Sequence, residues 1–197
     1  MASGTATAPY ELRFDSGRIC LDLLATTHPE ERIDSDESLR AWITGSGLVP
    51  AGTPLTSADS SWIAGFRELR GHIGQLVRGE PSRGSEPFGT ALGRVNELAL
   101  AAPPVPSAVW GDGDSLVRAL RSPPTCPALL AAVARDTVEL LTDPDARAGI
   151  RQCEGDNCPI VYLDTSRGRR RRWCSSEVCG NRERVARHRR RAALARA

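Results

Sequence analysis

Four of the six cysteines in this 197-residue chain have the spacing expected of ligands for a soft metal ion. Two close pairs, Cys153-x4-Cys158 and Cys174-x4-Cys179, are separated by 15 residues, which is the length of a hairpin. Each pair can turn two thiolates toward one point, and two such turns supply a tetrahedron of sulfur atoms at about 2.3 Å from a zinc ion. Thiolates select zinc or an iron–sulfur centre over magnesium or calcium. The spacing therefore predicts a zinc site, with an iron–sulfur cluster or a redox-labile dithiol pair as the alternatives.

Four protein sulfurs would leave no open coordination position for water or substrate, so we expect one structural Zn²⁺ ion. The rest of the chain has no pattern typical of an active site. His28 and His72 lie far apart in the sequence, without a GxSxG elbow or a carboxylate-rich helix beside them. Cys20 and Cys126 are expected to be small buried apolar residues. We therefore expect that the protein is not an enzyme.

Positive charge is concentrated in the same part of the chain as the four cysteines. Residues 151–197 carry 13 arginines and 5 acidic residues, a net charge of +8, whereas residues 1–150 carry 13 arginines and 19 acidic residues, a net charge of −6. Such asymmetry indicates a polyanionic partner for the C-terminal part. The chain contains no lysine, and arginine suits bidentate contacts with phosphate and guanine. The charge distribution therefore favours a nucleic acid as the partner.

Apolar periodicity indicates that the first three-quarters of the chain is mainly helical. The pattern at 12–27 is typical of a strand entering a helix, and a Gly-Asp-Gly turn joins two short strands, 108–110 and 115–120, in a hairpin. No apolar stretch approaches the roughly 18 residues of a membrane span, and no leader pattern precedes the first elements, so we expect a cytoplasmic protein. Steps of three and four residues between apolar side chains predict helices over 38–47, 57–77, 88–101 and 126–141.

Between the cysteine pairs, the sequence predicts a β-hairpin. Residues 160–163 have the composition of a strand, 164–168 that of a turn, and 169–173 that of the returning strand. Alternation along the returning strand would direct Arg170 and Arg172 to one face and their neighbours to the other. The tip of the hairpin is therefore expected to be positively charged on both faces.

A basic helix is predicted after the third cysteine, beginning near Ser175 and running past His188 toward Ala195. It has too little apolar surface to bury a wide face, so it should lie in solvent or on a partner. We expect the arginines of the hairpin to contact phosphates and those of the helix to lie along or in a groove of the nucleic acid. These candidate nucleic-acid contacts are Arg167, Arg169, Arg170, Arg171 and Arg172 on the hairpin, and Arg182, Arg184, Arg187, Arg189 and Arg190 on the helix.

Two stretches of the chain resemble known families. The string Cys179-Gly180-Asn181-Arg182, which follows Trp173-Cys174 and the arginine run, resembles the signature of the CGNR zinc-finger family, and the four cysteines fall on its ligand positions. Upstream, Ile19-Cys20-Leu21-Asp22-Leu23 and Leu39-x-x-Trp42 resemble ABATE, a stress-induced transcription regulator domain that accompanies this finger. One departure is Leu24-Ala25-Thr26, where that domain usually has Val-Asn-Thr. Any role tied to the asparagine is therefore in doubt.

Together, the residues and the resemblance predict an α+β fold in two parts. Residues 1–147 would form a predominantly helical N-terminal domain with a small sheet. Residues 148–197 would form a treble-clef or zinc-ribbon-like module of knuckle, β-hairpin and helix. The resemblance implies a bacterial transcription regulator of the stress response that contacts double-stranded DNA, with an N-terminal domain that senses a small-molecule effector or forms a homodimer. An RNA-binding protein, or a redox-sensing module that binds an acidic protein, are the alternatives.

Overall fold

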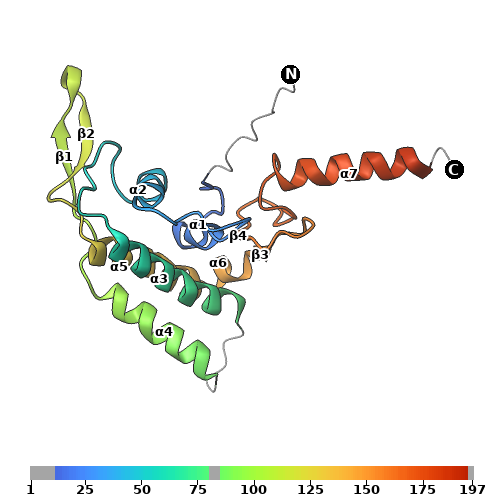
Figure 1. Ribbon diagram of the computed structural model, residues 1–197, viewed down its shortest axis with the longest axis horizontal. Helices are drawn as coiled ribbons and strands as arrows, with labels where there is room; N and C mark the ends of the chain where they lie inside the picture. Colours follow the sequence, from blue (N-terminus) through green and yellow to red (C-terminus); the bar gives the residue numbers. More distant parts are fainter. Residues whose placement is uncertain (1–11, 80–84, 195–197) are drawn as a thin grey trace, which may run out of the picture.

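The N-terminal part of the protein is built from packed helices. The computed structural model describes residues 12–79 and 85–194. Helices α3, α4 and α5 pack against one another, and α1 lies across α3 and α5 (Figure 1). All four helices predicted from apolar periodicity are confirmed within a few residues. The helices of this part are α1 (Ile19–Ala25), α2 (Asp36–Gly45), α3 (Ser60–Arg78), α4 (Glu86–Ala99), α5 (Cys126–Thr142) and α6 (Pro144–Ala148).

Short polar side chains fix where these helices begin. Ser35 and Ser38 form a capping box at the start of α2. The carboxylate of Asp59 accepts the first free N–H groups of α3, and the hydroxyl of Thr125 does the same for α5. Asp143 ends α5 and caps α6, which the sequence did not predict. The helices thus begin where the chain can satisfy their unpaired N–H groups.

The predicted strand at the start of the 12–27 segment is wrong, whereas the predicted helix is present as α1. Residues 12–18 are irregular, and among the described residues they make one backbone–backbone hydrogen bond to the C-terminal part, from the N–H of Leu163 to the carbonyl of Ser16 at 2.8 Å. Gly17, at φ +89°, lies against Leu163 at this point. This segment therefore contacts β4 (Val161–Leu163) at one point and does not pair with it as a strand.

Helix α1 is buried on all sides, because the helical part and the cysteine-containing part both cover it. Every residue from Cys20 to Ala25 is buried. Leu21, Leu23 and Leu24 belong to the main apolar core, whereas Ala25 packs with the four cysteines. Val161 and Leu163 of β4 join the main core from the other side. The stretches 1–147 and 148–197, expected as two parts, thus share packed side chains around α1.

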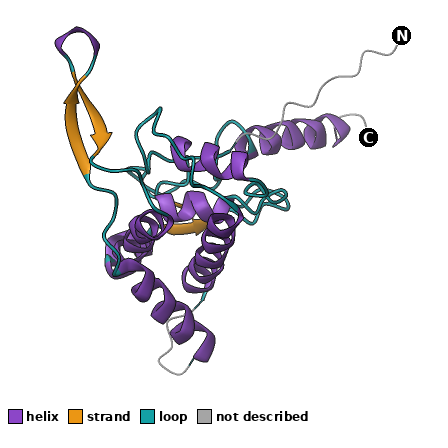
Figure 2. Cartoon of the chain, turned by 60° about the vertical axis from the view of Figure 1, so that its left-hand side comes forward, coloured by secondary structure: helices purple, strands orange, loops and turns teal. Residues whose placement is uncertain are grey.

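A two-stranded antiparallel sheet extends from the helical part, as predicted. Its strands are β1 (Pro106–Trp110) and β2 (Leu116–Leu120), joined by a 3₁₀ turn at Asp112–Asp114. Val109 lies opposite Val117 in the register. This hairpin projects away from the helices (Figure 2). The α+β fold class expected from the sequence is confirmed.

The hairpin predicted between the cysteine pairs is wrong in its pairing. Strand β4 is present where the sequence placed it, but its antiparallel partner is β3 (Ile150–Gln152), upstream of the first cysteine. Residues 169–173 are not a strand, because the carboxylate of Asp164 accepts the N–H of Arg171 that a ladder would need, at 2.9 Å. Arg169 has φ +46°, which further bends the chain. The arginines between the pairs therefore lie on a loop.

The C-terminal helix α7 (Cys179–Leu194) projects from the molecule on the side opposite the β1–β2 hairpin (Figure 1). The sequence placed its start near Ser175, four residues too early. The hydroxyl of Ser175 accepts the N–H groups of Glu177 and Val178 and so closes a separate turn before the helix. The predicted extension to Ala195 lies outside the described residues. Among the described helices, none is long and apolar enough to cross a membrane.

Asp22 is an acidic group enclosed by this packing. It lies in α1, is 7% exposed, and accepts the backbone N–H of Ser16 at 2.9 Å. Burial raises the pKa of Asp22 to about 6, although the hydrogen bond from Ser16 opposes the shift. Because this folded-state pKa lies above the unfolded value, protonation stabilises the fold. That contribution is complete at pH values below about 4 and is lost as the pH rises through 6.

We expect Asp22→Asn to raise the melting temperature at pH 7.5. The amide oxygen can still accept the N–H of Ser16, and the cost of a buried charge, on the order of 2 kcal/mol, is removed. The gain over the wild type should shrink as the pH falls below 6, where Asp22 itself is neutral. Thermal unfolding of both proteins at pH 7.5 and 5 measures this. An equal difference at both pH values would contradict the assignment.

Candidate metal centre and nucleic-acid interface

The four cysteines predicted as ligands converge on one point. Cys153 and Cys158 bound a short loop between β3 and β4, residues 153–158, which we call the knuckle. Cys174 ends the loop of residues 164–174, which we call the arginine loop, and Cys179 is the first residue of α7. Their Sγ atoms all lie within 4.8 Å of one another, and all four residues are buried. Cys174 Sγ is 3.7 Å from Cys158 Sγ and 3.6 Å from Cys179 Sγ. A zinc ion with four bonds of about 2.3 Å separates its sulfurs by about 3.8 Å, so the cluster fits one tetrahedral zinc.

The loop between the first two cysteines is shaped for close approach of the backbone to sulfur. The N–H groups of Gly155 and Cys174 point at Cys153 Sγ, at 3.4 and 3.3 Å. A Cβ at position 155 would lie 3.2 Å from Cys179 Sγ, so glycine leaves room for the fourth ligand. Asn157 takes a positive φ of +55°, which asparagine tolerates better than most residues. The knuckle thus supplies both ligands and hydrogen-bond donors to them.

Arg13 is a contact of the cluster that sequence reasoning missed. Its guanidinium donates to Cys174 Sγ at 3.1 Å and to the Cys174 carbonyl at 3.0 Å, and Asp15 holds it from the other side at 2.8 Å. A tetrathiolate zinc site carries a net charge of about −2, so a half-buried cation beside it is favourable. No spacing signal in the sequence connects Arg13 with a cysteine 161 positions away. Only the packing of the N-terminal segment on β4 brings them together.

The protonation of the thiols explains why the cluster requires a cation. Burial, followed by negative charge on Cys174 and Cys153, raises the pKa of Cys158 to about 11. Burial and Cys174 likewise hold the pKa of Cys179 above its usual range. For Cys153 the N–H groups of Cys174 and Gly155 outweigh burial and lower the pKa. Four thiolates this close repel one another, and a bound zinc ion supplies the charge that balances them and ties the knuckle to α7.

A buried carboxylate organises the arginine loop. Asp164 is 3% exposed, and its two oxygens accept the N–H groups of Ser166 and Arg171, each at 2.9 Å. The Ser166 hydroxyl, followed by these two N–H groups, holds the pKa of Asp164 below its usual range. The N–H of Glu154 donates to the carbonyl of Arg172 at 2.9 Å, which joins the loop to the knuckle. The loop therefore has a fixed shape beside the metal site.

Arg171 has a structural position in this loop, although the sequence predicted it as a phosphate contact. Its guanidinium donates to the carbonyl of Trp173 at 2.9 Å and also to the carbonyl of Cys174. It lies 4.5 Å from the centre of the Tyr162 ring and reaches the carbonyl of Asp15 at 3.3 Å. Its Nε and Nη2 donors are thus directed into the protein, where they join the N-terminal segment to the third cysteine.

The remaining predicted arginines divide into two groups. Several form intramolecular contacts: Arg169 with Asp145, Arg172 with Glu154, Arg184 with the carbonyls of Gly180 and Ser176, and Arg187 and Arg190 with Glu183. The others have no hydrogen bond or ion pair from the guanidinium to any described residue. The predicted residues in this second group are Arg167 and Arg170 on the loop and Arg182 and Arg189 on α7; Arg191 on α7, which was not predicted, has the same property, and we call all five the free arginines.

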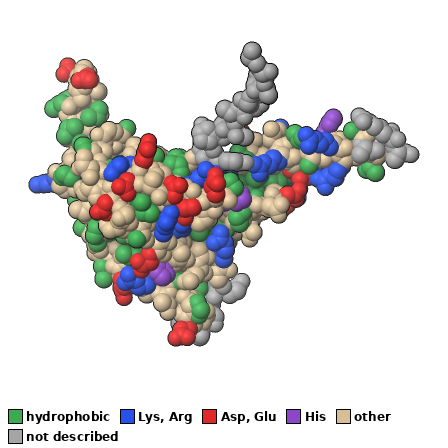
Figure 3. Space-filling view, in the orientation of Figure 1, with side chains coloured by type: hydrophobic (Ala, Val, Ile, Leu, Met, Phe, Trp, Pro, Cys, Tyr) green, Lys and Arg blue, Asp and Glu red, His purple; other side chains and the backbone are tan. Residues whose placement is uncertain are grey.

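Helix α7 presents these side chains away from the rest of the protein. It projects into solvent, and arginine side chains lie along it (Figure 3). Its few apolar side chains are exposed as well, Val185 at 44% and Leu194 at 79%. The expectation that this helix buries no wide apolar face is consistent with these exposures. The helix and the loop meet at the cysteine cluster, so the metal site fixes the angle between the two basic elements.

A cavity of about 810 Å³ lies between the N-terminal segment and the cysteine-containing part, residues 150–194, which we call the finger. Its walls include Arg13 and His28 from the helical part, and Asp156, Glu177 and Arg182 from the finger. The cavity therefore lies between the two parts, whereas the sequence placed an effector site in the N-terminal domain alone. Binding of a small-molecule effector to the N-terminal domain remains a prediction.

We expect zinc affinity to depend on pH and on each of the four thiols. Ligands with raised pKa values must lose protons to bind, so the affinity should fall by at least about tenfold per pH unit between pH 8 and 6. Cys174→Ala should abolish binding of one equivalent of zinc, whereas Cys126→Ala, a cysteine outside the cluster, should preserve it. Competition with a chromophoric chelator measures both. Zinc affinity that is flat with pH would contradict the thiol assignment.

Arg171 and Arg170 are neighbours with opposite expected phenotypes. Arg171→Ala removes donors to buried carbonyls and should lower the stability of the finger by about 1–3 kcal/mol and speed zinc loss to a chelator. Arg170→Ala, whose side chain has no partner among the described residues, should leave the melting temperature and zinc loss unchanged. Thermal unfolding and chelator kinetics test the pair. Equal effects of the two substitutions would show that the loop does not depend on Arg171.

Comparison with known families agrees with this architecture. Residues 17–144 match the ABATE family, described as a putative stress-induced transcription regulator, and residues 150–192 match the CGNR zinc finger. No curated protein matches the chain. The four converging cysteines lie within the second match and together indicate one zinc ion. The chain belongs to the ABATE family and carries a C-terminal CGNR zinc finger.

Proposed function

We propose that this protein regulates transcription by binding double-stranded DNA with its arginine loop and helix α7. The observation that carries the proposal is the set of free arginines on two elements that the cysteine cluster holds together. Guanidinium groups without an intramolecular partner are available for phosphate oxygens and for base edges. The regulator domain of the family supports the same role.

The dimensions of α7 fit a groove of duplex DNA. A helix of 16 residues is about 24 Å long and, with its side chains, about 10–12 Å wide. The major groove of B-DNA is about 12 Å wide and admits one helix. Because no element among the described residues covers the outer half of α7, its surface is open to such a partner (Figures 1 and 2). In this arrangement the loop at the start of α7 reaches the phosphates that border the groove.

The proposal includes no catalytic step. Four thiolates complete the coordination of a zinc ion, so the ion has no position for a substrate. Zinc acts by fixing the position of the loop relative to the helix. The process that the protein controls is transcription in the bacterial cytoplasm. The stress response named for the family would then set when the regulator acts.

DNA binding should be strongly salt-dependent. Contacts with five to eight phosphates, from the free arginines and the exposed paired ones, predict a slope of about −4.5 to −7 for log affinity against log salt. Arg170→Ala and Arg189→Ala should each reduce the slope by about 0.9, while Arg94→Ala on α4 serves as a matched control with no effect. Fluorescence anisotropy with duplex DNA between 50 and 250 mM salt measures these slopes.

The same titration distinguishes the other nucleic-acid class. Excess structured RNA should compete poorly with duplex DNA, because the deep, narrow major groove of A-form RNA does not admit a helix. Stronger competition by RNA would replace DNA with RNA as the partner. Absence of salt-dependent binding to either nucleic acid would refute the proposal.

A further inference from the structure

The β1–β2 hairpin exposes large apolar side chains that no described part of the protein covers. Trp110 is 74% exposed and Leu116 is 64% exposed, and the two lie opposite each other near the tip. Val109 and Val117 form the next pair and are also exposed. An isolated two-stranded hairpin is only marginally stable in water, and its edges are open for pairing. The projecting hairpin (Figure 2) is therefore suited to a binding partner.

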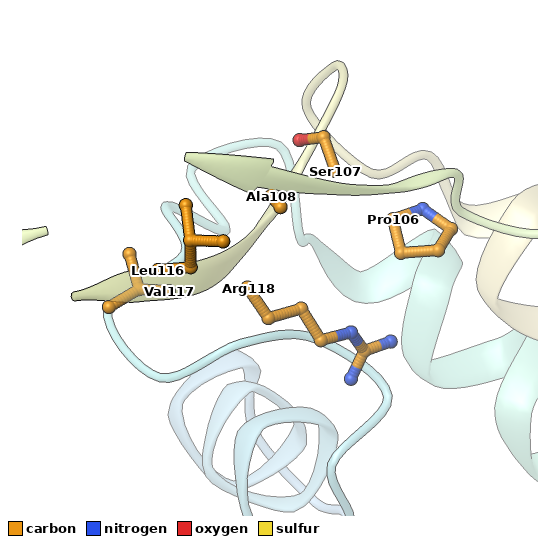
Figure 4. Close-up of a pocket in the computed structure, with 6 residues that line it drawn as sticks. All are labelled: Pro106, Ser107, Ala108, Leu116, Val117 and Arg118. Carbon is orange, nitrogen blue, oxygen red and sulfur yellow. The ribbon is translucent and has the colours of Figure 1, made fainter. Parts of the chain in front are cut away.

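One face of the hairpin has a protrusion next to a recess. Alternation along the strands places Pro106, Ala108 and Trp110 of β1 on the same face, together with Leu116 and Arg118 of β2. A hollow of about 340 Å³ lies over the small side chain of Ala108, between Pro106 and Leu116 (Figure 4). The bulky indole of Trp110 thus lies one step along the strand from a shallow, open hollow whose floor is the small side chain of Ala108.

The two ends of the hairpin carry opposite charges. Asp112 and Asp114 lie at the exposed tip, and Arg118 and Arg121 lie toward the base. None of these four side chains forms an ion pair or hydrogen bond with any other described residue. Negative charge at one end and positive charge at the other make the face complementary to itself in the reversed direction.

We propose that this face is the dimer interface of the protein, occupied by the same hairpin of a second copy in antiparallel orientation. A two-fold axis at the level of Val109 exchanges the levels of Trp110 and Ala108, which are about 7 Å apart along the strand. Each indole then enters the hollow at Ala108 of the other copy. The same rotation brings the acidic tip of each hairpin to the base of the other, beside Arg118 and Arg121.

Self-complementarity is what selects a second copy over other partners. A two-fold interface requires one patch to match itself, which the protrusion, the recess and the reversed charges all do. Nucleic acid is disfavoured at this face, because the carboxylates of Asp112 and Asp114 would repel phosphates. The hairpin lies on the side of the molecule opposite α7 (Figure 1), so the proposed dimer leaves the basic elements open. The proposal is independent of whether the basic elements bind DNA or RNA.

The oligomeric state of the full zinc-loaded chain tests the proposal. In sedimentation equilibrium between about 1 and 100 μM the wild type should be dimeric, and Trp110→Glu should weaken association at least tenfold. Because Trp110 is mostly exposed, its replacement should leave the fold of each subunit, and therefore the circular dichroism spectrum, unchanged. Leu92→Glu, an exposed apolar residue on α4, is the matched control and should remain dimeric. A monomeric wild type, or a Trp110→Glu variant that dimerises normally, would overturn the proposal.

Charge reversal tests the antiparallel arrangement separately. Asp112→Arg/Asp114→Arg makes both ends of the hairpin positive, and Arg118→Asp/Arg121→Asp makes both negative, so each variant alone should dimerise at least tenfold more weakly. In an equimolar mixture every tip meets a base of opposite sign, and a heterodimer should form with affinity close to that of the wild type. Differential tagging and co-purification detect it. A mixture that associates no better than its components would rule out the tip-to-base geometry.

Discussion

Repulsion among four buried thiolates is the constraint around which residues 150–194 are arranged. Their sulfur atoms lie within 4.8 Å of one another, a distance that only a shared cation makes favourable. The ligands come from the knuckle after β3, from the end of the arginine loop and from the first turn of α7. Zinc therefore links elements that share little apolar surface. Without it, the loop and the helix would have no fixed relation.

The finger is also integrated into the regulator domain, and this integration has a functional consequence. Arg13 contacts the sulfur of Cys174, Leu163 bonds to Ser16, and the side chain of Ala25 packs among the cysteines. A change in the helical part would therefore be transmitted through α1 and the N-terminal segment to the start of α7. The cavity between the two parts lies on this route. The packing thus provides a physical basis for coupling the helical part to the element that we propose contacts DNA.

The sequence predicted features that depend on local periodicity or on ligand chemistry. Helices α2 to α5 follow from apolar spacing, and the zinc site follows from cysteine spacing, because both signals are contained in short stretches. The strand partner of β4 could not be predicted, since β3 has only three residues and no visible alternation. Residues 169–173 were predicted as a strand but form a loop, because the carboxylate of Asp164 accepts the N–H of Arg171 that strand pairing would use. The contact of Arg13 could not be predicted either, because its partner, Cys174, is distant in the sequence.

Net charge alone does not identify the arginines that are free for a partner, because arginine has a second use in this protein. The guanidinium of Arg171 bridges the carbonyls of Trp173 and Cys174, and Arg135 likewise bridges those of Ala99 and Ala101. Arg40 holds the carbonyls of Leu55 and Ala58 in the same way. A planar fork of donors can satisfy two loop carbonyls at once, which a lysine ammonium does less well. In a chain whose cations are all arginine, an arginine run therefore combines residues that build the loop with residues that face a partner, and only the position of each guanidinium separates the two.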